Sequence, residues 1–184
     1  MTPDVEIKHM LQEAWRLRTE GKYDESKTLL GKAQNLCQPD DFNLLGRIYH
    51  IYMQHEYDRQ NLEEALAFSN ESVAQYTQAK NLDRLAHAIR HRGDIQSELG
   101  RLDSSERDYL SALGVYKKDL NVYNGDLANA LRSYALLLEK RKLYGRALRI
   151  WKEVKDIYVA YQISPGIAEA TDKINQLKEG DEER

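Results

Sequence analysis

The chain repeats a short pattern of side-chain sizes. A small residue is followed by a larger residue four positions on and by another small one three positions further. The four sets are Ser26/Leu30/Ala33, Ala65/Ser69/Ser72, Ser105/Tyr109/Ala112 and Ala147/Trp151/Val154, of which only the second lacks the bulky middle member. Their first members recur after 39, 40 and 42 residues. A near-constant period of roughly 20–50 residues is typical of stacked repeat arrays, so the pattern predicts a solenoid and favours a binding function.

The composition is that of one soluble helical domain. The 184 residues are 41% hydrophobic and 31% charged, which supplies ordinary core material for a single domain. Only 3 prolines and 10 glycines leave little room for long loops or turn-rich β structure. The net charge of −3 argues against a generic nucleic-acid binder, because such domains are usually strongly basic.

The sequence predicts a cytoplasmic location. No run of about 18 apolar residues is present, so we expect no membrane span. The N-terminal residues MTPDVEIKHM lack the basic start and apolar stretch of a signal peptide. The single cysteine, Cys37, cannot form an internal disulfide and fits a reducing compartment.

Apolar spacings of three and four residues run through the chain, while strand signals are nearly absent. This periodicity predicts helices at about 4–20, 24–37, 40–58, 62–79, 82–99, 103–118, 125–140, 144–161 and 165–178. The short connections predict antiparallel neighbours. We expect Asp24 and Asp103 to satisfy free amide groups at the start of a second helix. Gly21 and Gly100, just before them, suit turns with positive φ.

The first helix of each pair has its own small residue where its neighbour would cross closely: Ala14, Gly46, Gly93 and Ala135. The gap from this residue to the following set is 12 residues in three repeats and 19 in the second. Seven extra residues equal about two helical turns. The sequence therefore predicts that the first helix of the second repeat is two turns longer and protrudes past the edge of the array.

Several segments carry a family resemblance. GKYDESKTLLGKA, GRLDSSERDYLSAL and KLYGRALRIWKEV resemble the second helices of tetratricopeptide repeats (TPRs), and LGRIY, RHRGDI and YALLLE resemble first helices. The period is similar to the roughly 42-residue variety of kinesin light chains rather than to the standard unit of ~34 residues. The resemblance covers residues 8–160 and implies an all-α, right-handed α-solenoid of antiparallel helix hairpins. A single domain, 1–184, would hold repeats at about 4–37, 40–79, 82–118 and 125–161, with a C-terminal capping helix at about 165–178.

In TPR arrays the first helices line a concave groove, so the resemblance implies that the polar stripe of each first helix lies there. Matching the stripes through Gly46, Gly93 and Ala135 predicts these peptide-binding residues: Asn43, Arg47, His50, His87, Arg90, Asp94, Asn129 and Arg132. A guanidinium donates two parallel hydrogen bonds to a carboxylate, and a carboxamide donates to peptide carbonyls. We therefore expect a scaffold or adaptor that binds a peptide or protein segment, acidic or carboxylate-bearing. The plainer interpretation is a solvated surface on which Arg90 pairs with Asp94 along its own helix.

Other chemistry is weakly supported. His87 and His91 are spaced to share a metal ion, but Arg90 and Arg92 oppose a cation, so we expect no metal and no cofactor. An enzyme that uses Cys37 or this histidine pair lacks any nucleophile–base signature or Gly-rich phosphate loop, and we expect no enzymatic activity.

Two further surfaces remain open. Residues 138–155 carry seven basic and two acidic side chains, which we interpret as a solvated surface rather than as a nucleic-acid site. The alternative to groove binding is a homo-oligomer, formed through an end hairpin or through the long second-repeat helix. Ile51, Tyr52 and Tyr57 would supply an exposed apolar seam on that helix.

Overall fold

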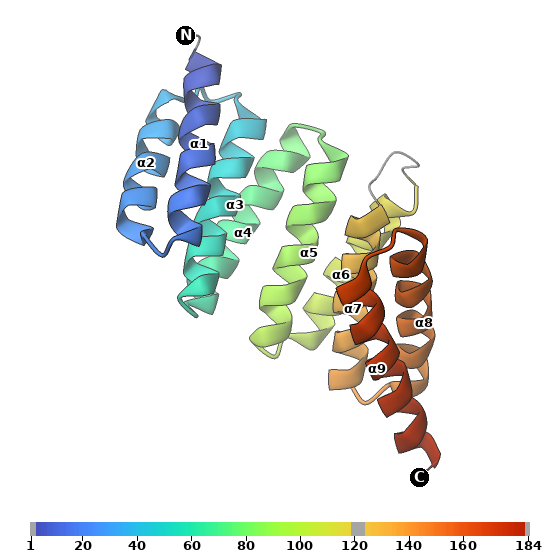
Figure 1. The fold of residues 1–184 in the computed structure, drawn as a ribbon. Coiled ribbons are helices and arrows are strands. Elements are labelled where there is room, and N and C mark those ends of the chain that lie inside the picture. The colour runs from blue at the N-terminus through green and yellow to red at the C-terminus, as the bar shows by residue number, and fades with distance from the viewer. Residues whose placement is uncertain (1–2, 119–123, 183–184) are drawn as a thin grey trace.

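The computed structural model describes residues 3–118 and 124–182, and over these ranges the chain is an array of helices without strands (Figure 1). The helices are α1 (Pro3–Thr19), α2 (Tyr23–Leu36), α3 (Phe42–Asp58), α4 (Leu62–Gln78), α5 (Leu82–Glu98), α6 (Leu102–Tyr116), α7 (Asn124–Lys140), α8 (Tyr144–Ala160) and α9 (Ser164–Glu182). All nine predicted helices are confirmed within these ranges, with ends that differ by at most four residues. No helix in the described ranges is long and apolar enough to cross a membrane.

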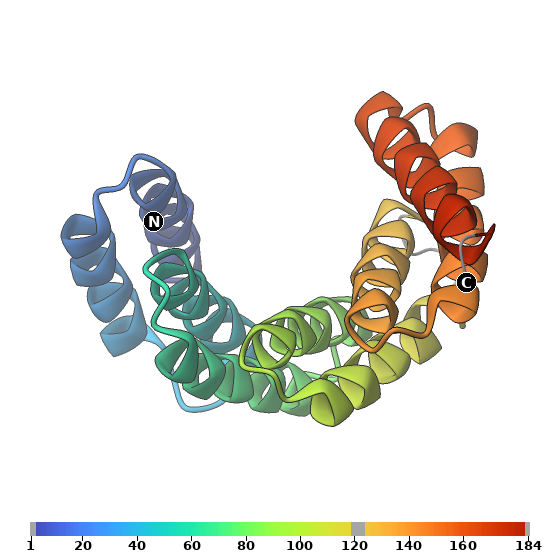
Figure 2. The same cartoon turned by 90° about the horizontal axis from the view of Figure 1, so that it is seen from below.

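The helix pairs stack into an arc (Figure 2). The first helix of each pair and the terminal α9 lie on the inner side of the arc, while α2, α4, α6 and α8 lie on the outer side. Short connections between helices force this antiparallel hairpin arrangement. Each hairpin buries its apolar face against the next one, which is how repeat arrays obtain a continuous core.

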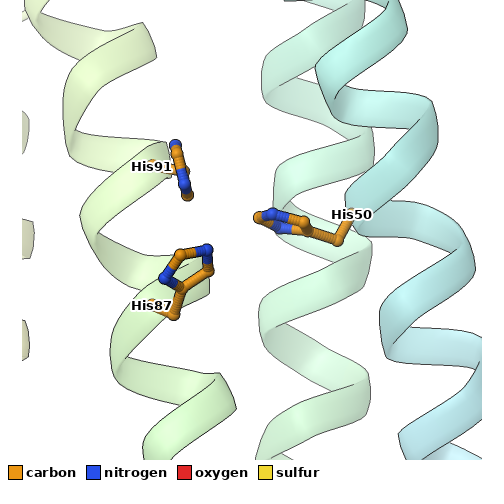
Figure 3. A group of neighbouring side chains, drawn as sticks. All are labelled: His50, His87 and His91. Atoms are coloured by element: carbon orange, nitrogen blue, oxygen red, sulfur yellow. The ribbon is translucent and has the colours of Figure 1, made fainter. Parts of the chain in front are cut away.

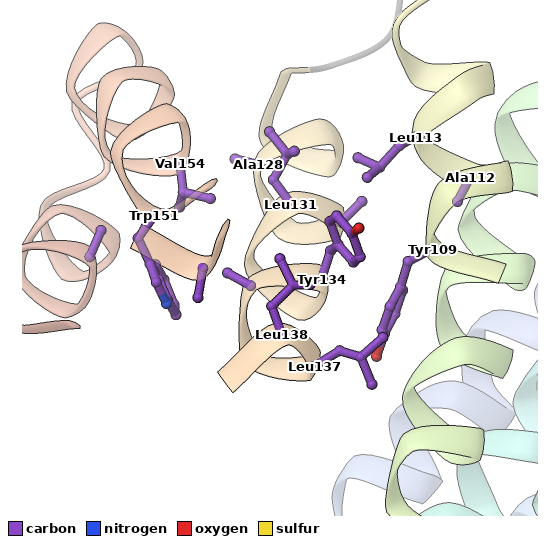
Figure 4. Packing of buried hydrophobic residues seen from close by; sticks show 14 of the residues in the cluster. Tyr109, Ala112, Leu113, Ala128, Leu131, Tyr134, Leu137, Leu138, Trp151 and Val154 are labelled. Carbon is purple, nitrogen blue, oxygen red and sulfur yellow. The ribbon is translucent and has the colours of Figure 1, made fainter. Parts of the chain in front are cut away.

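The repeated size pattern marks the crossings between the two helices of a hairpin. All twelve members of the four sets are buried. Ser26 and Ser105 donate hydrogen bonds to the carbonyls of Ala14 and Gly93, with oxygen–oxygen distances of 2.5 and 2.8 Å. The larger middle residues Tyr109 and Trp151 pack on either side of α7, in the core that the third and fourth hairpins share (Figure 4).

The predicted lengthening of α3 is wrong. α3 has 17 residues, as do α1, α5 and α7. The residue 12 positions before Ala65 is Met53, which is buried and takes the place that Ala14 has in the first repeat. Gly46 makes a second close crossing, since Ser72 donates to its carbonyl at 2.9 Å and a Cβ there would lie 2.8 Å from the Tyr76 ring.

The error arises from the symmetry of an antiparallel hairpin. The pair Gly46/Ser72 is reached from Met53/Ala65 by moving seven residues back on one helix and seven forward on the other. Because seven residues are close to two turns, both pairs face each other across the same interface. Residue size alone therefore could not decide which pair corresponds to the crossings in the other repeats.

The turns within the hairpins use left-handed backbone. Gly21 and Gly100 have φ of 75° and 73°, which confirms the prediction for both. Gln60 and Lys142 occupy the same turn position with φ of 63° and 60°, although a side chain makes this conformation costly.

The predicted capping by aspartate is wrong. α2 and α6 begin at Tyr23 and Leu102, so Asp24 and Asp103 lie inside the first turn. Neither of these helices has a side-chain hydrogen bond at its N-cap. The two carboxylates can still complement the positive end of the helix dipole.

Candidate functional site

The inner face of the arc is hollowed along its length. One hollow, of about 470 Å³, lies over α5 and α7 and includes Arg90, Asp94 and Arg132 in its wall. A second hollow of about 170 Å³ lies between α3 and α5, and a third of about 240 Å³ adjoins it near the C-terminal end of α3. The second hollow is lined by Trp15, Arg47, His50, Ile51, Gln54, Tyr76, Arg84 and His87.

The corrected register changes which groove residues correspond. Counting back from Ala65, Ser105 and Ala147, the residues equivalent to one another are His50, Arg90 and Arg132. Arg47 instead corresponds to His87 and to Asn129. The three predicted arginines therefore do not lie in one row, and the row that contains two of them has a histidine in the second repeat.

The two arginines of that row are already paired within the chain. Arg90 Nη1 donates to Asp94 Oδ2 at 3.0 Å, as the plainer interpretation expected. Arg132 donates two hydrogen bonds to the Glu169 carboxylate of α9, at 2.6 and 2.5 Å. A guanidinium that already donates two hydrogen bonds to a carboxylate has few N–H groups left for a ligand.

The two predicted asparagines also have partners. Asn81 donates to Asn43 Oδ1 at 2.8 Å, across the α3–α5 seam. Tyr158 donates to Asn129 Oδ1 at 3.2 Å. Among the described residues neither side chain donates through its amide nitrogen, so each nitrogen can still donate hydrogen bonds to a ligand.

Arg47 keeps its guanidinium available, and a second arginine joins it. Within the described residues, neither Arg47 nor Arg84 has a side-chain hydrogen bond or ion pair, and both line the hollow between α3 and α5. Trp15 borders the same hollow with 47% of its surface exposed. Trp15 and Arg84 were not among the predicted groove residues. Trp15 is equivalent to Asp94 in the register of the first and third repeats, so extending the polar stripe to the first helix would have found it.

Three histidines meet beside this hollow. His50 on α3 faces His87 and His91 on α5, with ring centroids 5.2 and 5.1 Å from that of His50 (Figure 3). His87 and His91 are 4.7 Å apart by the same measure. Burial is the main cause that lowers their pKa values, to about 3 for His50, to about 4 for His87 and well below 6.5 for His91. The nearby positive charge of Arg90 acts in the same direction, so all three rings are neutral at pH 7.

Solved structures with the same arrangement of helices are helical repeat proteins. A putative kinesin light chain from Podospora anserina with nearly identical TPR-like repeats superposes with a TM-score of 0.70, at 13% identity over 96% of this chain and 95% of the other. The yeast histone chaperone Hif1, a scaffold protein recruiting protein complexes to core histones, gives 0.67 at 14% identity over 96% of each chain. BtubC from P. vanneervenii gives 0.56 at 14% identity, over 98% and 92%.

The fold is a TPR-like repeat array. This confirms the all-α solenoid that the sequence resemblance implied. No family model and no curated protein matches the sequence.

The two candidate nucleophiles of this TPR-like array differ in exposure, since Cys37 is partly exposed and Ser26 is buried. Burial is the main cause that raises the pKa of the Cys37 thiol to about 11, and its sulfur lies 3.4 Å from the Ala33 carbonyl. Ser26 Oγ and His55 Nε2 are 2.8 Å apart, a spacing that a catalytic pair could use, but both side chains are buried. Ser26 and His55 instead join α2 to α3 within the core.

The basic surface of the array is partly neutralised by the preceding repeat. Arg141 pairs with Asp103 and Glu106, and Arg146 lies 3.3 Å from Glu106. Lys140 donates to the Ser97 carbonyl at 3.3 Å. These basic residues therefore help to join the third and fourth repeats.

The predicted seam for self-association is wrong. Ile51 and Tyr52 are only 2% and 8% exposed and belong to the core between the first two repeats. Tyr57 is partly buried and donates a hydrogen bond to Glu98. The seam was expected on a protruding helix, and α3 does not protrude.

Proposed function

We propose that the protein is a non-catalytic scaffold or adaptor that binds a peptide or protein segment in the concave groove. The observation that carries this proposal is the hollow between α3 and α5, which is lined by an exposed tryptophan and by two guanidiniums that have no partner among the described residues. Tryptophan and arginine are enriched among the few residues that carry most of the binding energy at protein interfaces.

The chemistry of the hollow favours an acidic segment with an apolar side chain nearby. Arg47 and Arg84 can each hold a carboxylate through two parallel hydrogen bonds. Trp15 offers a large apolar face that an aliphatic or aromatic side chain can cover. His87 borders the hollow as a neutral ring and adds no charge of its own.

In the α5–α7 half of the groove, basic side chains are paired with acidic ones. Arg90, Arg132 and Lys173 there face Asp94, Glu169 and Glu139 across hydrogen bonds or ion pairs. This half presents mixed charge over a hollow of about 470 Å³, which suits the polar backbone of an extended segment more than a cluster of acidic side chains. The acidic part of the ligand is therefore assigned to the α3–α5 half.

The TPR-like neighbours are consistent with a protein-binding role. Hif1 is described as a scaffold protein recruiting protein complexes to core histones. One fold serves many binders, so the partner of this chain has to be argued from its own groove.

A charge-reversal experiment tests the proposal. Arg47→Glu combined with Arg84→Glu should abolish binding to acidic peptides on an array, measured for individual hits by fluorescence polarisation. Each lost charge-assisted pair is worth about 1.5–3 kcal/mol, so affinity should fall at least tenfold per residue. Trp15→Ala should weaken the hits that carry an apolar residue and spare those that do not.

The matched control reverses two charges outside the groove. Lys32 on α2 and Lys152 on α8 are exposed, and no hydrogen bond or ion pair joins either side chain to another described residue. Lys32→Glu combined with Lys152→Glu should bind as the wild type does. Equal loss in both double variants, or no loss in the groove variant, would refute the proposal.

A further inference from the structure

The seam between the second and third hairpins contains a cluster of histidines where an apolar contact is expected. The corresponding seam between α1 and α3 is packed with residues such as Leu11, Ile48 and Ile51. At the α3–α5 seam His91 takes the position equivalent to Ile51, and His50 and His87 lie against it. The three rings are only partly exposed, and withdrawing polar rings from water costs stability unless they have partners, so the cluster needs a reason.

We propose that His50, His87 and His91 form a binding site for a single transition-metal ion, for which Zn²⁺ is the reference, and that the ion clamps α3 to α5. One ligating nitrogen from each ring lies within 4.8 Å of the other two. His87 and His91 are four residues apart, which places both on the same face of α5. The set combines neighbouring ligands on one helix with a third from another helix.

The distances are compatible with such an ion. Zn²⁺–nitrogen bonds of about 2.0–2.1 Å in tetrahedral geometry place two ligating nitrogens about 3.4 Å apart. Rotation of the imidazoles about their side-chain bonds therefore has to shorten the nitrogen–nitrogen distances by up to about 1.4 Å. Neutral imidazole suits Zn²⁺, Cu²⁺ and Ni²⁺ and is a poor ligand for Mg²⁺ or Ca²⁺, which defines the class of ion.

Two buried polar atoms at the cluster lack a hydrogen-bond partner among the described residues, which supports a bound ion there. These atoms are His50 Nδ1 and Gln54 Oε1. Unsatisfied buried groups of this kind are uncommon and call for an explanation. Gln54 lies one turn after His50 and lines the hollows on both sides of the cluster, where its oxygen could complete the coordination or hold a bound water.

Asp94 lies behind one of the three rings. Arginine can only donate, so the 2.8 Å contact from Arg90 Nη2 means that His91 Nε2 accepts and that the proton of this ring is on Nδ1. That Nδ1 lies 3.6 Å from Asp94 Oδ2. A carboxylate behind a ligating histidine fixes the ring and makes it a better ligand.

The contact between Arg90 Nη2 and His91 Nε2 explains how the positive charge of Arg90 is accommodated. The guanidinium occupies the lone pair of His91 Nε2 that the metal ion would take, so the two cations compete for one position. Arg90 also pairs with Asp94 at 3.0 Å and can keep that partner when it releases the ring. Arg90 is thus an internal competitor that lowers the affinity without removing the site.

Titration of the tag-free full chain with ZnCl₂ tests the proposal. After treatment with a chelator, calorimetry should show one ion per chain, and CoCl₂ should give the visible absorption of a site with nitrogen ligands. ZnCl₂ at about 100 times its dissociation constant should raise the melting temperature by roughly 5–10 °C. These readouts need no peptide, so the result is independent of groove binding.

Variants identify the ligands. His50→Gln and His87→Gln should each weaken Zn²⁺ binding by at least about 100-fold, which exceeds the usual effect of an outer-shell change. They lie on different helices, so misfolding of one, checked by circular dichroism, leaves the other informative. His9→Gln, on the exposed side of α1, is the matched control and should bind as the wild type does. Arg90→Gln removes the competing cation and should tighten binding by about tenfold.

The proposal is overturned if the wild type binds no stoichiometric Zn²⁺ or Co²⁺. It is also overturned if a folded His50→Gln or His87→Gln variant binds Zn²⁺ with unchanged affinity, because the ion would then be held elsewhere.

Discussion

Adding one methyl group at Gly93 tests the packing of the α5–α6 hairpin. A Cβ at this position would lie 2.8 Å from Cε1 and 3.0 Å from Cδ1 of Tyr109. The ring cannot withdraw easily, because it is only 2% exposed and its hydroxyl donates to Asp94 at 2.8 Å. Gly93→Ala therefore forces either the backbone of α5 or the Tyr109–Asp94 hydrogen bond to shift.

The magnitude follows from two opposing contributions. Overpacking of a core typically costs about 1–3 kcal/mol. Alanine gains about 1 kcal/mol over glycine in the interior of a helix. The net effect of Gly93→Ala on the free energy of unfolding is therefore a loss of about 0–2 kcal/mol.

Gly114 on α6 provides the matched control. It also lies inside a helix, but a Cβ there meets no atom within 4 Å. Gly114→Ala should stabilise the protein by about 1 kcal/mol through helix propensity alone. The helix-propensity gain cancels in the comparison, so the two variants should differ by the full packing cost of about 1–3 kcal/mol.

Urea unfolding followed by circular dichroism measures this difference. A difference of this size also corresponds to roughly 2–4 °C of melting temperature for each kcal/mol. If Gly93→Ala proves as stable as Gly114→Ala, the close crossing of α5 and α6 at Gly93 is wrong, and with it the role assigned to the small residues of the first helices.

Substitutions at four further residues have defined outcomes. Gln60→Gly and Lys142→Gly should each raise the free energy of unfolding by about 0.5–1 kcal/mol, with a corresponding rise in melting temperature, because glycine removes the strain of the left-handed backbone. The control Lys142→Ala keeps the Cβ and should not raise the melting temperature in this way. Burial lowers the pKa of His55 from 6.5 to about 4, so unfolding takes up a proton between these values and stability falls as the pH drops through them. The difference in the free energy of unfolding between wild type and His55→Gln should accordingly decrease by on the order of 3 kcal/mol from pH 7 to pH 4 in urea titrations. A difference that stays constant with pH would contradict the lowered pKa of His55. Trp151→Ala should cost about 3–5 kcal/mol, since the indole is fully buried and its Nε1 donates to Glu139 at 2.7 Å; a loss below about 1 kcal/mol in the same titration would show that the site collapses around the missing ring.

In the candidate groove, the local sequence pattern predicted which residues share a face of one helix but not how two helices align. The predicted residues His87, Arg90 and Asp94 of α5 all line hollows of the inner face, because they follow the period of 3.6 residues. The relation of α5 to α3 was misjudged by seven residues, because Gly46 was matched to Gly93 by size. That displacement separated His50 from His87 and His91 in the sequence interpretation, whereas the structure places the three rings together.

The sequence by itself determined the helices, their pairing into hairpins and the buried sets such as Ser105/Tyr109/Ala112. These features depend on local periodicity and on the volume allowed at a crossing, which are properties of neighbouring residues. Only the tertiary structure decided the partners of the groove side chains, as between Arg132 and Glu169 on α9. Such partners lie on different hairpins, and their meeting depends on how the hairpins pack, which no spacing within one helix records.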